Sequence, residues 1–251
     1  MISALQRSNI ALGSFFFRFR NAFFPIVFLL ALGVMRPRVA MGRPGLDRFL
    51  TTLGGLVALA GAGLRLATIG FEYIERGGKN KRVYASRLVQ RGVYAHTRNP
   101  MYVANTLIVV GICMLAGSPA AYGIVIPFFL FVYQAIVAAE EDFLRRKFGQ
   151  EYEEYRARVP RFIPSLRGAR ESFAGMTYNW RRAVRQDLST LLMVSMSLIL
   201  LPVWRSYFLQ GSAAVGAAAP RALAIALGVG LVYAVLVYLK KTRRFFYEPN
   251  R

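Results

Sequence analysis

The chain contains little cysteine, histidine or acid. Cys113 is its single cysteine and His96 its single histidine, and 12 Asp and Glu stand against 33 Lys and Arg, for a net charge of +21. One cysteine excludes an intramolecular disulfide. One His and one Cys also exclude a zinc site built from His and Cys ligands, so we expect no metal centre. We expect Cys113, which lies within an apolar run, to be a small buried residue.

Apolar residues make up 55% of the 251 residues. They gather in runs long enough to cross a bilayer, because about 20 helical residues span its core. These runs predict an all-α, polytopic membrane helical bundle with five to six transmembrane helices. The expected segments are 21–35, 49–71, 101–117, 120–139, 188–208 and 222–239.

The first of these segments, 21–35, gives the weakest signal. Its uncharged core is short, and Arg18 and Arg20 precede it. A tilted or interfacial helix therefore remains an alternative to a full crossing. The two arginines also lie too deep for a cleaved signal peptide, so we expect the segment to be retained.

Positive charge is concentrated in the connections between the apolar runs. Lys and Arg dominate 72–98 and the tail after residue 239. This pattern follows the positive-inside rule and favours anionic lipid head groups as partners rather than nucleic acid. It predicts that 72–98, 141–187 and the C-terminus face the cytoplasm. The loop 36–48 also carries four arginines, which disagrees with six straight crossings.

Two polar motifs flank the pair of apolar runs between residues 101 and 139. Arg98-Asn99-Pro100-Met101-Tyr102 precedes them and Glu140-Glu141 follows them. Two crossings that turn at 117–119 would return both motifs to one face of the membrane. The sequence therefore predicts a single polar site built from both ends of a helical hairpin.

Each motif has a structural and a functional interpretation. Asn99 and Pro100 suit a capped helix start, and Glu141 could pair with Arg145 one turn later. Alternatively, the helix N-terminus could hold a carboxylate or phosphate, flanked by Tyr102 and Asn105. The two glutamates could then accept hydrogen bonds from a cationic or hydroxyl-bearing ligand.

A charge inside an apolar segment needs a partner. Arg65 is such a charge, and we expect Glu140 or Glu141 to pair with it. The glycines of the same segment are typical of close helix packing in membranes.

Beyond Glu140 the sequence changes character. Apolar residues recur at helical spacing with a break at Gly149, which predicts a cytosolic amphipathic extension that lies on the membrane or caps a site. The stripe consists of Phe143, Leu144, Phe148, Tyr152, Tyr155 and Val159.

The combined motif resembles the integral-membrane methyltransferases, which include isoprenylcysteine carboxyl methyltransferases and phospholipid N-methyltransferases. The resemblance rests on Gly92-x-Tyr94-x-x-x-Arg98-Asn99-Pro100-Met101-Tyr102-x-x-Asn105, on Glu140-Glu141, and on Phe148-Gly149-x-x-Tyr152-x-x-Tyr155 to Val159-Pro160-Arg161-x-Ile163-Pro164. It implies S-adenosylmethionine as cofactor at the cytosolic face and a lipid substrate that enters from the bilayer. The cofactor-binding residues implied by position are Arg98, Asn99, Pro100, Tyr102, Asn105, Glu140 and Glu141.

The chain departs from the family pattern at two positions. Asn99 stands where many members have His, which removes a titratable group, although Asn-Pro-Met-Tyr is similar to the phosphatidylethanolamine methyltransferase version. Ala104 stands where Gly is usual. No catalytic residue is assigned, because an amine acceptor would need a base whereas a carboxylate or thiolate acceptor would not.

The expected division is a methyltransferase core at 1–187, with its motif region at 87–164, and an appended transmembrane hairpin with a basic tail at 188–251. The expected reaction is phospholipid N-methylation or isoprenylcysteine-type carboxyl O-methylation. An NADPH-dependent membrane reductase and a non-catalytic lipid-binding protein remain alternatives. The sequence leaves the acceptor atom and the oligomeric state open.

Overall fold

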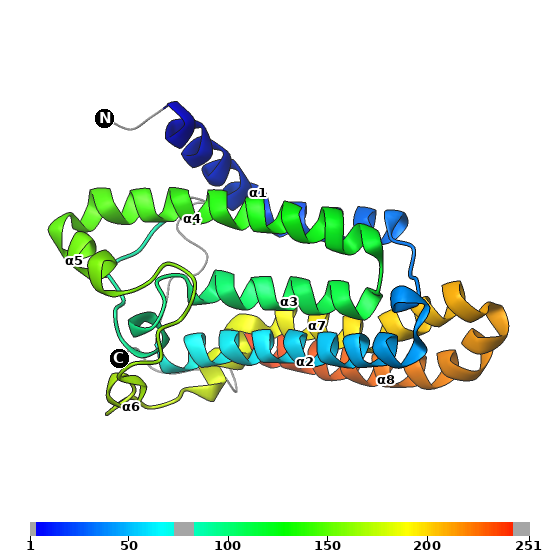
Figure 1. The fold of residues 1–251 in the computed structure, drawn as a ribbon. Helices are drawn as coiled ribbons and strands as arrows, with labels where there is room; N and C mark the ends of the chain where they lie inside the picture. The colour runs from blue at the N-terminus through cyan, green and yellow to red at the C-terminus, as the bar shows by residue number, and fades with distance from the viewer. Residues whose placement is uncertain (1–3, 73–82, 243–251) are drawn as a thin grey trace.

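The computed structural model describes residues 4–72 and 83–242, and within these ranges the chain is helical without strands. The long helices are α1 (Ala4–Val34), α2 (Pro44–Phe71), α3 (Pro100–Ala116), α4 (Ile126–Phe148), α7 (Trp180–Gln210) and α8 (Ser212–Lys241). The short helices are η1 (Ala40–Gly42), η2 (Gly92–Ala95), the π-helical turn η3 (Ala121–Val125), α5 (Gln150–Arg158) and α6 (Ala169–Ser172). The expected all-α fold is confirmed (Figure 1).

Within the described residues, four helices are long and apolar enough to cross a membrane. They are Pro44–Phe71, Ala121–Phe148, Trp180–Gln210 and Ala218–Lys241. The bent pair Arg7–Arg20 and Ala22–Val34 would make a fifth, and α3 is a shorter apolar helix of 17 residues. The protein is therefore a multi-pass membrane protein with four to five candidate spans among the described residues, which agrees with the expected polytopic bundle.

α1, which contains the first apolar segment, is not straight. Its parts Arg7–Arg20 and Ala22–Val34 meet at an angle of 84° around Asn21, so the expected segment begins at the bend. Pro25, four positions later, has no N–H to donate to the carbonyl of Asn21, and a missing bond of this kind is a common cause of a helix kink.

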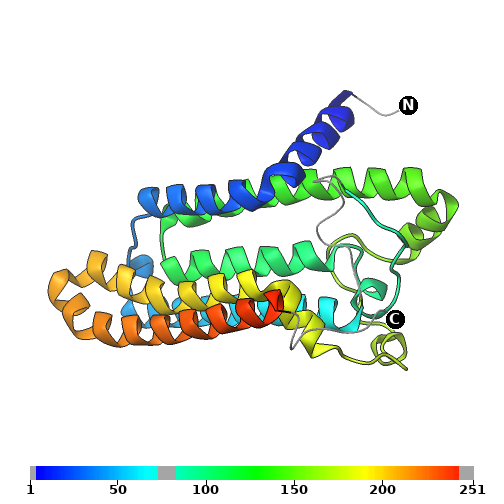
Figure 2. The ribbon, with the colours of Figure 1, turned by 180° about the vertical axis from the view of Figure 1, so that it is seen from behind.

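Two groups of helices build the bundle. The second half of α1 runs along α4, whereas α2 packs on α3 and α7, and α8 lies along the outer side of α7 (Figures 1 and 2). Of the glycines of the second apolar segment that predicted close packing, Gly54 and Gly61 lie where α2 meets α3, whereas nothing lies within 4 Å of a Cβ at Gly63. A Cβ at Gly111 would approach the backbone nitrogen of Ala58 to 2.4 Å, and one at Gly54 the carbonyl oxygen of Gly111 to 2.8 Å.

The end of the bundle away from the Arg98 motif is held by the loop after α1. The N–H of Arg38 donates to the carbonyl of Gly117 over 2.9 Å, and the N–H of Arg36 to Oγ of Ser118 over 3.1 Å. Asp47 pairs with the buried guanidinium of Arg205 from α7. The basic loop 36–48 thus lies at the same end as the 117–119 turn.

The expected domain boundary between residues 187 and 188 falls inside α7. The helix begins at Trp180 and packs against α2 and α3 along its course. The division into a core and an appended hairpin stays a prediction, but α7 itself is continuous across it.

Candidate functional site

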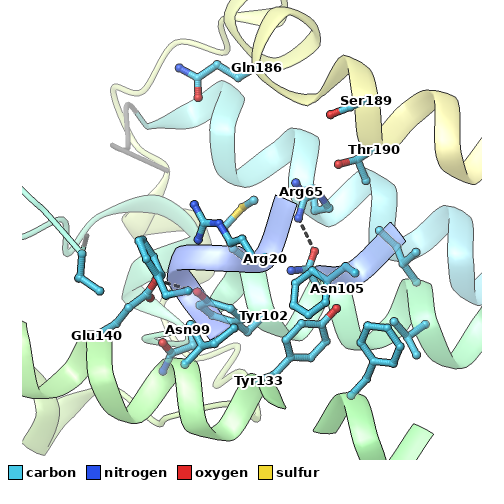
Figure 3. A pocket seen from close by; sticks show the side chains of 18 of the residues that line it. Arg20, Arg65, Asn99, Tyr102, Asn105, Tyr133, Glu140, Gln186, Ser189 and Thr190 are labelled. Atoms are coloured by element: carbon cyan, nitrogen blue, oxygen red, sulfur yellow. Dashed lines mark hydrogen bonds between the residues drawn. The ribbon is translucent and has the colours of Figure 1, made fainter. Parts of the chain in front are cut away.

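A cavity of about 1530 Å³ separates the α1 and α4 pair from α2, α3 and α7 (Figure 3). Arg98, Tyr102 and Glu140 line it near the start of α3 and the end of α4. Cys113 and Phe129 line it farther along the same helices, where the walls are apolar. The cavity therefore joins a polar end to an apolar interior.

The hairpin brings the two sequence motifs together, as predicted. Arg98 Nε donates to Oε1 of Glu141 over 3.2 Å. Its Nη1 donates to the carbonyls of Arg156 and Val159, each over 2.9 Å. Arg98 therefore binds the C-terminal end of α5 as well as α4, although it also lines the cavity.

The start of α3 offers fewer backbone donors than the sequence suggested. Pro100 has no N–H, and the amides of Tyr102 and Val103 donate to the carbonyl of Asn99 over 3.0 and 3.1 Å. The Asn99 side chain does not cap the helix. Its Nδ2 donates instead to the carbonyl of Arg161 over 3.1 Å.

The adjacent glutamates have different surroundings. Glu141 accepts from Arg98 and from Nδ2 of Asn99 at 3.3 Å, and its Oε2 lies 3.0 Å from Nε of Arg161. It lies outside the cavity lining, so the structure assigns it to a clamp that joins α3, α4 and the segment after α5. Its expected role in cofactor binding stays a prediction.

Glu140 points into the cavity instead (Figure 3). Consecutive helix residues project about 100° apart, which explains why neighbouring carboxylates separate in this way. Tyr102 Oη donates to Oε1 of Glu140 over 2.7 Å. Arg20, at the bend of α1, lines the same end of the cavity.

Arg65 does not pair with Glu140 or Glu141, so that expectation was wrong. Its Nε donates to Oδ2 of Asp187 over 2.9 Å, and its Nη2 to Oδ1 over 2.5 Å. Nη1 of Arg65 donates to Oδ1 of Asn105. Asp187 is fully buried and is the only acid of α7. The only acid of α7 and an arginine inside the apolar run 49–71 were the signal that could have predicted this pair.

The expected amphipathic extension is present and breaks at Gly149, as predicted. Gly149 adopts a φ of 51° between α4 and α5. Tyr152, Tyr155 and Val159 are buried against Leu88, Leu144 and Phe148. The extension therefore packs over the end of α4 and caps the polar end of the cavity.

His96 holds the segment after the extension. Its ring nitrogens contact the carbonyl of Ser165 and, over 2.6 Å, Oγ of Ser172. The ring is buried and stacks on Phe173. These contacts give His96 a structural role.

Comparison with known proteins identifies the part of the chain that carries the motif. Residues 51–151 match the model of the family described as phospholipid methyltransferase. This segment belongs to the integral-membrane methyltransferase superfamily. It contains α3, α4 and both glutamates, whereas α7 and α8 lie outside it. The resemblance seen in the sequence is confirmed.

Curated relatives match over a similar stretch. The cobalt-zinc-cadmium resistance protein CzcN of Cupriavidus metallidurans is 35% identical over 115 residues, which cover 44% of this chain and 50% of that protein. The nickel-cobalt-cadmium resistance protein NccN of Alcaligenes xylosoxydans xylosoxydans is 29% identical over 111 residues, 44% of this chain and 51% of that protein.

A named methyltransferase is also among the relatives. The protein-S-isoprenylcysteine O-methyltransferase of Schizosaccharomyces pombe is 34% identical over 99 residues, which cover 38% of this chain and 39% of that protein. The chain thus spans about half or less of the length of the curated relatives that it matches. No solved structure matches the chain.

Proposed function

We propose that the protein is an S-adenosylmethionine-dependent methyltransferase whose acceptor is a lipid or a lipidated small molecule, with its site at the cytosolic face of the membrane. The observation that carries this proposal is the cavity that joins the Tyr102 and Glu140 pair to an apolar interior between α3 and α4. The matched family and the fungal relative support methyl transfer as the reaction.

The residues at the polar end fit this cofactor. S-adenosylmethionine carries an ammonium group, a sulfonium, a carboxylate and ribose hydroxyls, and it would supply an activated methyl group. Glu140 is a carboxylate that can accept from the ammonium or a ribose hydroxyl, and Tyr102 fixes its orientation. Arg20 and Arg98 line the same region and suit the carboxylate.

The protein's contribution to such a reaction is chiefly positioning and exclusion of water. The α5 extension covers the polar end, and Arg98 fastens its last carbonyls to the start of α3. The apolar walls near Ile112 and Phe129 suit a hydrocarbon chain. An amine acceptor would have to lose a proton, for which Glu140 is the nearby carboxylate, whereas a carboxylate acceptor would react directly.

The decisive test replaces Glu140 by Gln, which keeps the shape of the side chain and removes its charge. Loss of a charge-assisted hydrogen bond of about 1.5–3 kcal/mol should weaken S-adenosylmethionine binding roughly 10- to 100-fold. Calorimetry on the purified protein measures this affinity. The matched control is Glu153→Gln on α5, where the carboxylate is partly exposed and pairs with Arg145.

Glu153→Gln should bind the cofactor as the wild type does, and both variants should unfold at the wild-type temperature. Equal affinities of Glu140→Gln and the wild type would remove Glu140 from the site. Wild-type protein that moves no labelled methyl into phosphatidylethanolamine or a farnesylcysteine analogue would contradict the proposed activity.

A further inference from the structure

The wall of the cavity opposite Glu140 comes from α7, outside the residues that match the family (Figure 3). Gln186, Ser189, Thr190 and Met193 all line the cavity. Their spacing of three, four and seven positions places them on one face of the helix. Gln186, Ser189 and Thr190 thus give α7 a polar face that borders the cavity.

The hydroxyls of Ser189 and Thr190 are not bonded back to their own helix, unlike several others in the long helices. Thr68, Ser197 and Ser206 each donate to the carbonyl four residues earlier, over 2.7, 2.8 and 2.9 Å. Within the described ranges 4–72 and 83–242, neither the Ser189 nor the Thr190 hydroxyl makes a hydrogen bond. Both residues line the cavity, so their hydroxyls are available to a group bound there.

Asn105 adds a further donor, and α7 fixes its orientation. Asp187 holds Arg65, and Arg65 in turn donates to Oδ1 of Asn105. Because Oδ1 faces Arg65, the two Nδ2 protons of Asn105 are left for the cavity that it lines. Asp187 is thus a positioning residue that acts through Arg65.

The cavity offers hydrogen-bond donors on the wall opposite Glu140 as well as at its polar end. Glu140 can accept hydrogen bonds on the α4 side, whereas Asn105, Ser189 and Thr190 can donate on the α3 and α7 side, with the cationic Arg185 also in the lining. Grouped donors beside a cation suit the oxygens of an anion. Phosphodiesters and carboxylates both present such oxygens.

We propose that the α7 face, together with Asn105, binds the anionic head group of the acceptor lipid and holds it against the methyl donor. This assignment rests on the proposed function, because it takes the ligand of this wall to be the acceptor. It gives α7 a role in substrate selection that the matched segment does not supply.

Binding of simple lipids tests the site without any turnover. Hexadecyl phosphate, hexadecanoate and hexadecanol carry chains of the same length and differ in the head group. Purified protein in maltoside detergent should bind one or both anionic lipids at least tenfold more tightly than the alcohol. A preference for the phosphate or the carboxylate identifies which oxyanion the site takes.

The double variant Ser189→Ala and Thr190→Val should lose most of this preference. Ser206→Ala, which removes a hydroxyl bonded to its own helix, is the matched control and should retain it. Equal binding of the alcohol by the wild type, or an undiminished preference in the double variant, would overturn the proposal.

Methyl-transfer kinetics separate this site from the proposed activity. In the double variant the acceptor KM should rise about tenfold, as for loss of a hydrogen bond to a charged group, while the KM for S-adenosylmethionine stays unchanged. A rise in the cofactor KM alone would assign the α7 face to the cofactor and overturn the inference. Absence of methyl transfer in the wild type, with the anion preference intact and dependent on Ser189 and Thr190, would refute the activity but leave an anionic-lipid site on α7.

Discussion

The two faces of α3 differ in how closely they approach their neighbours. Toward α2 the contact is backbone to backbone, since a Cβ at Gly111 would approach the carbonyl oxygen of Gly54 to 2.5 Å and the nitrogen of Ala58 to 2.4 Å. Toward α4, Tyr102 and other side chains line the cavity. One helix thus forms both a backbone-to-backbone interface and a wall of the site.

This difference shows what decides whether apolar helices close on each other in a membrane. Lipid is as apolar as the helices, so association depends on packing and hydrogen bonding, and small residues allow the backbones to meet. The cavity-facing side of α3 carries an aromatic and an amide instead. α3 meets α4 through side chains such as Tyr102 and Tyr133, whose ring centroids lie 5.8 Å apart, rather than backbone to backbone.

The largest loss of stability should come from Asp187→Ala, at the contact between α7 and α2. Removal of this carboxylate leaves Arg65 buried without its counter-ion, which costs about 3–5 kcal/mol. Unfolding of the purified protein measures the loss. The matched control is Glu153→Ala, which breaks a partly exposed pair with Arg145 and should cost at most about 1 kcal/mol.

The double variant Arg65→Met and Asp187→Leu removes both charges and should recover most of the stability lost in Asp187→Ala, because neither buried charge is then left alone. Equal losses in Asp187→Ala and Glu153→Ala would show that the pair does not hold α7 to α2.

A smaller but still large effect should follow from Gly111→Val. The added side chain would meet the backbone of α2. Because a backbone cannot move aside by a change of rotamer, we expect the free energy of unfolding to fall by about 3 kcal/mol. Gly63→Val on α2 is the control, since nothing lies within 4 Å of a Cβ there. It should stay within about 0.5 kcal/mol of the wild type. Similar stabilities of the two variants would contradict the close contact of α2 and α3.

The sequence predicted the parts of this arrangement that depend on local pattern or on chain length. The length of the two apolar runs predicted that Arg98 and the glutamates would meet, and the helical stripe with its break at Gly149 predicted the extension. The glycines predicted close packing. Each of these signals is carried by residues near one another in the chain or by the thickness of the bilayer.

The sequence did not predict features that depend on the rotation of one helix against another. The predicted partner of Arg65 was wrong because pairing it with Asp187 requires knowing which faces of α2 and α7 meet. The different surroundings of Glu140 and Glu141 depend on the angle at which α4 faces the cavity. The polar face of α7 was missed because Ser189 and Thr190 lie outside the motif and become significant only beside Asn105.

The smallest loss of stability should come from changes in α5, which caps the polar end of the cavity. Tyr155 lines the cavity and its Oη donates to the carbonyl of Tyr94 over 2.8 Å, so Tyr155→Phe should cost about 1 kcal/mol. Tyr152 is the matched control, because its buried hydroxyl has no hydrogen-bond partner among the described residues. Tyr152→Phe should therefore be neutral or slightly stabilising. Burial raises the pKa of the Tyr155 hydroxyl, so the group stays protonated even above its ordinary pKa, and the loss in Tyr155→Phe should be the same at pH 6 and pH 8. Equal stabilities of the two variants in thermal unfolding would show that the cap is held by apolar packing alone, without the bond to Tyr94.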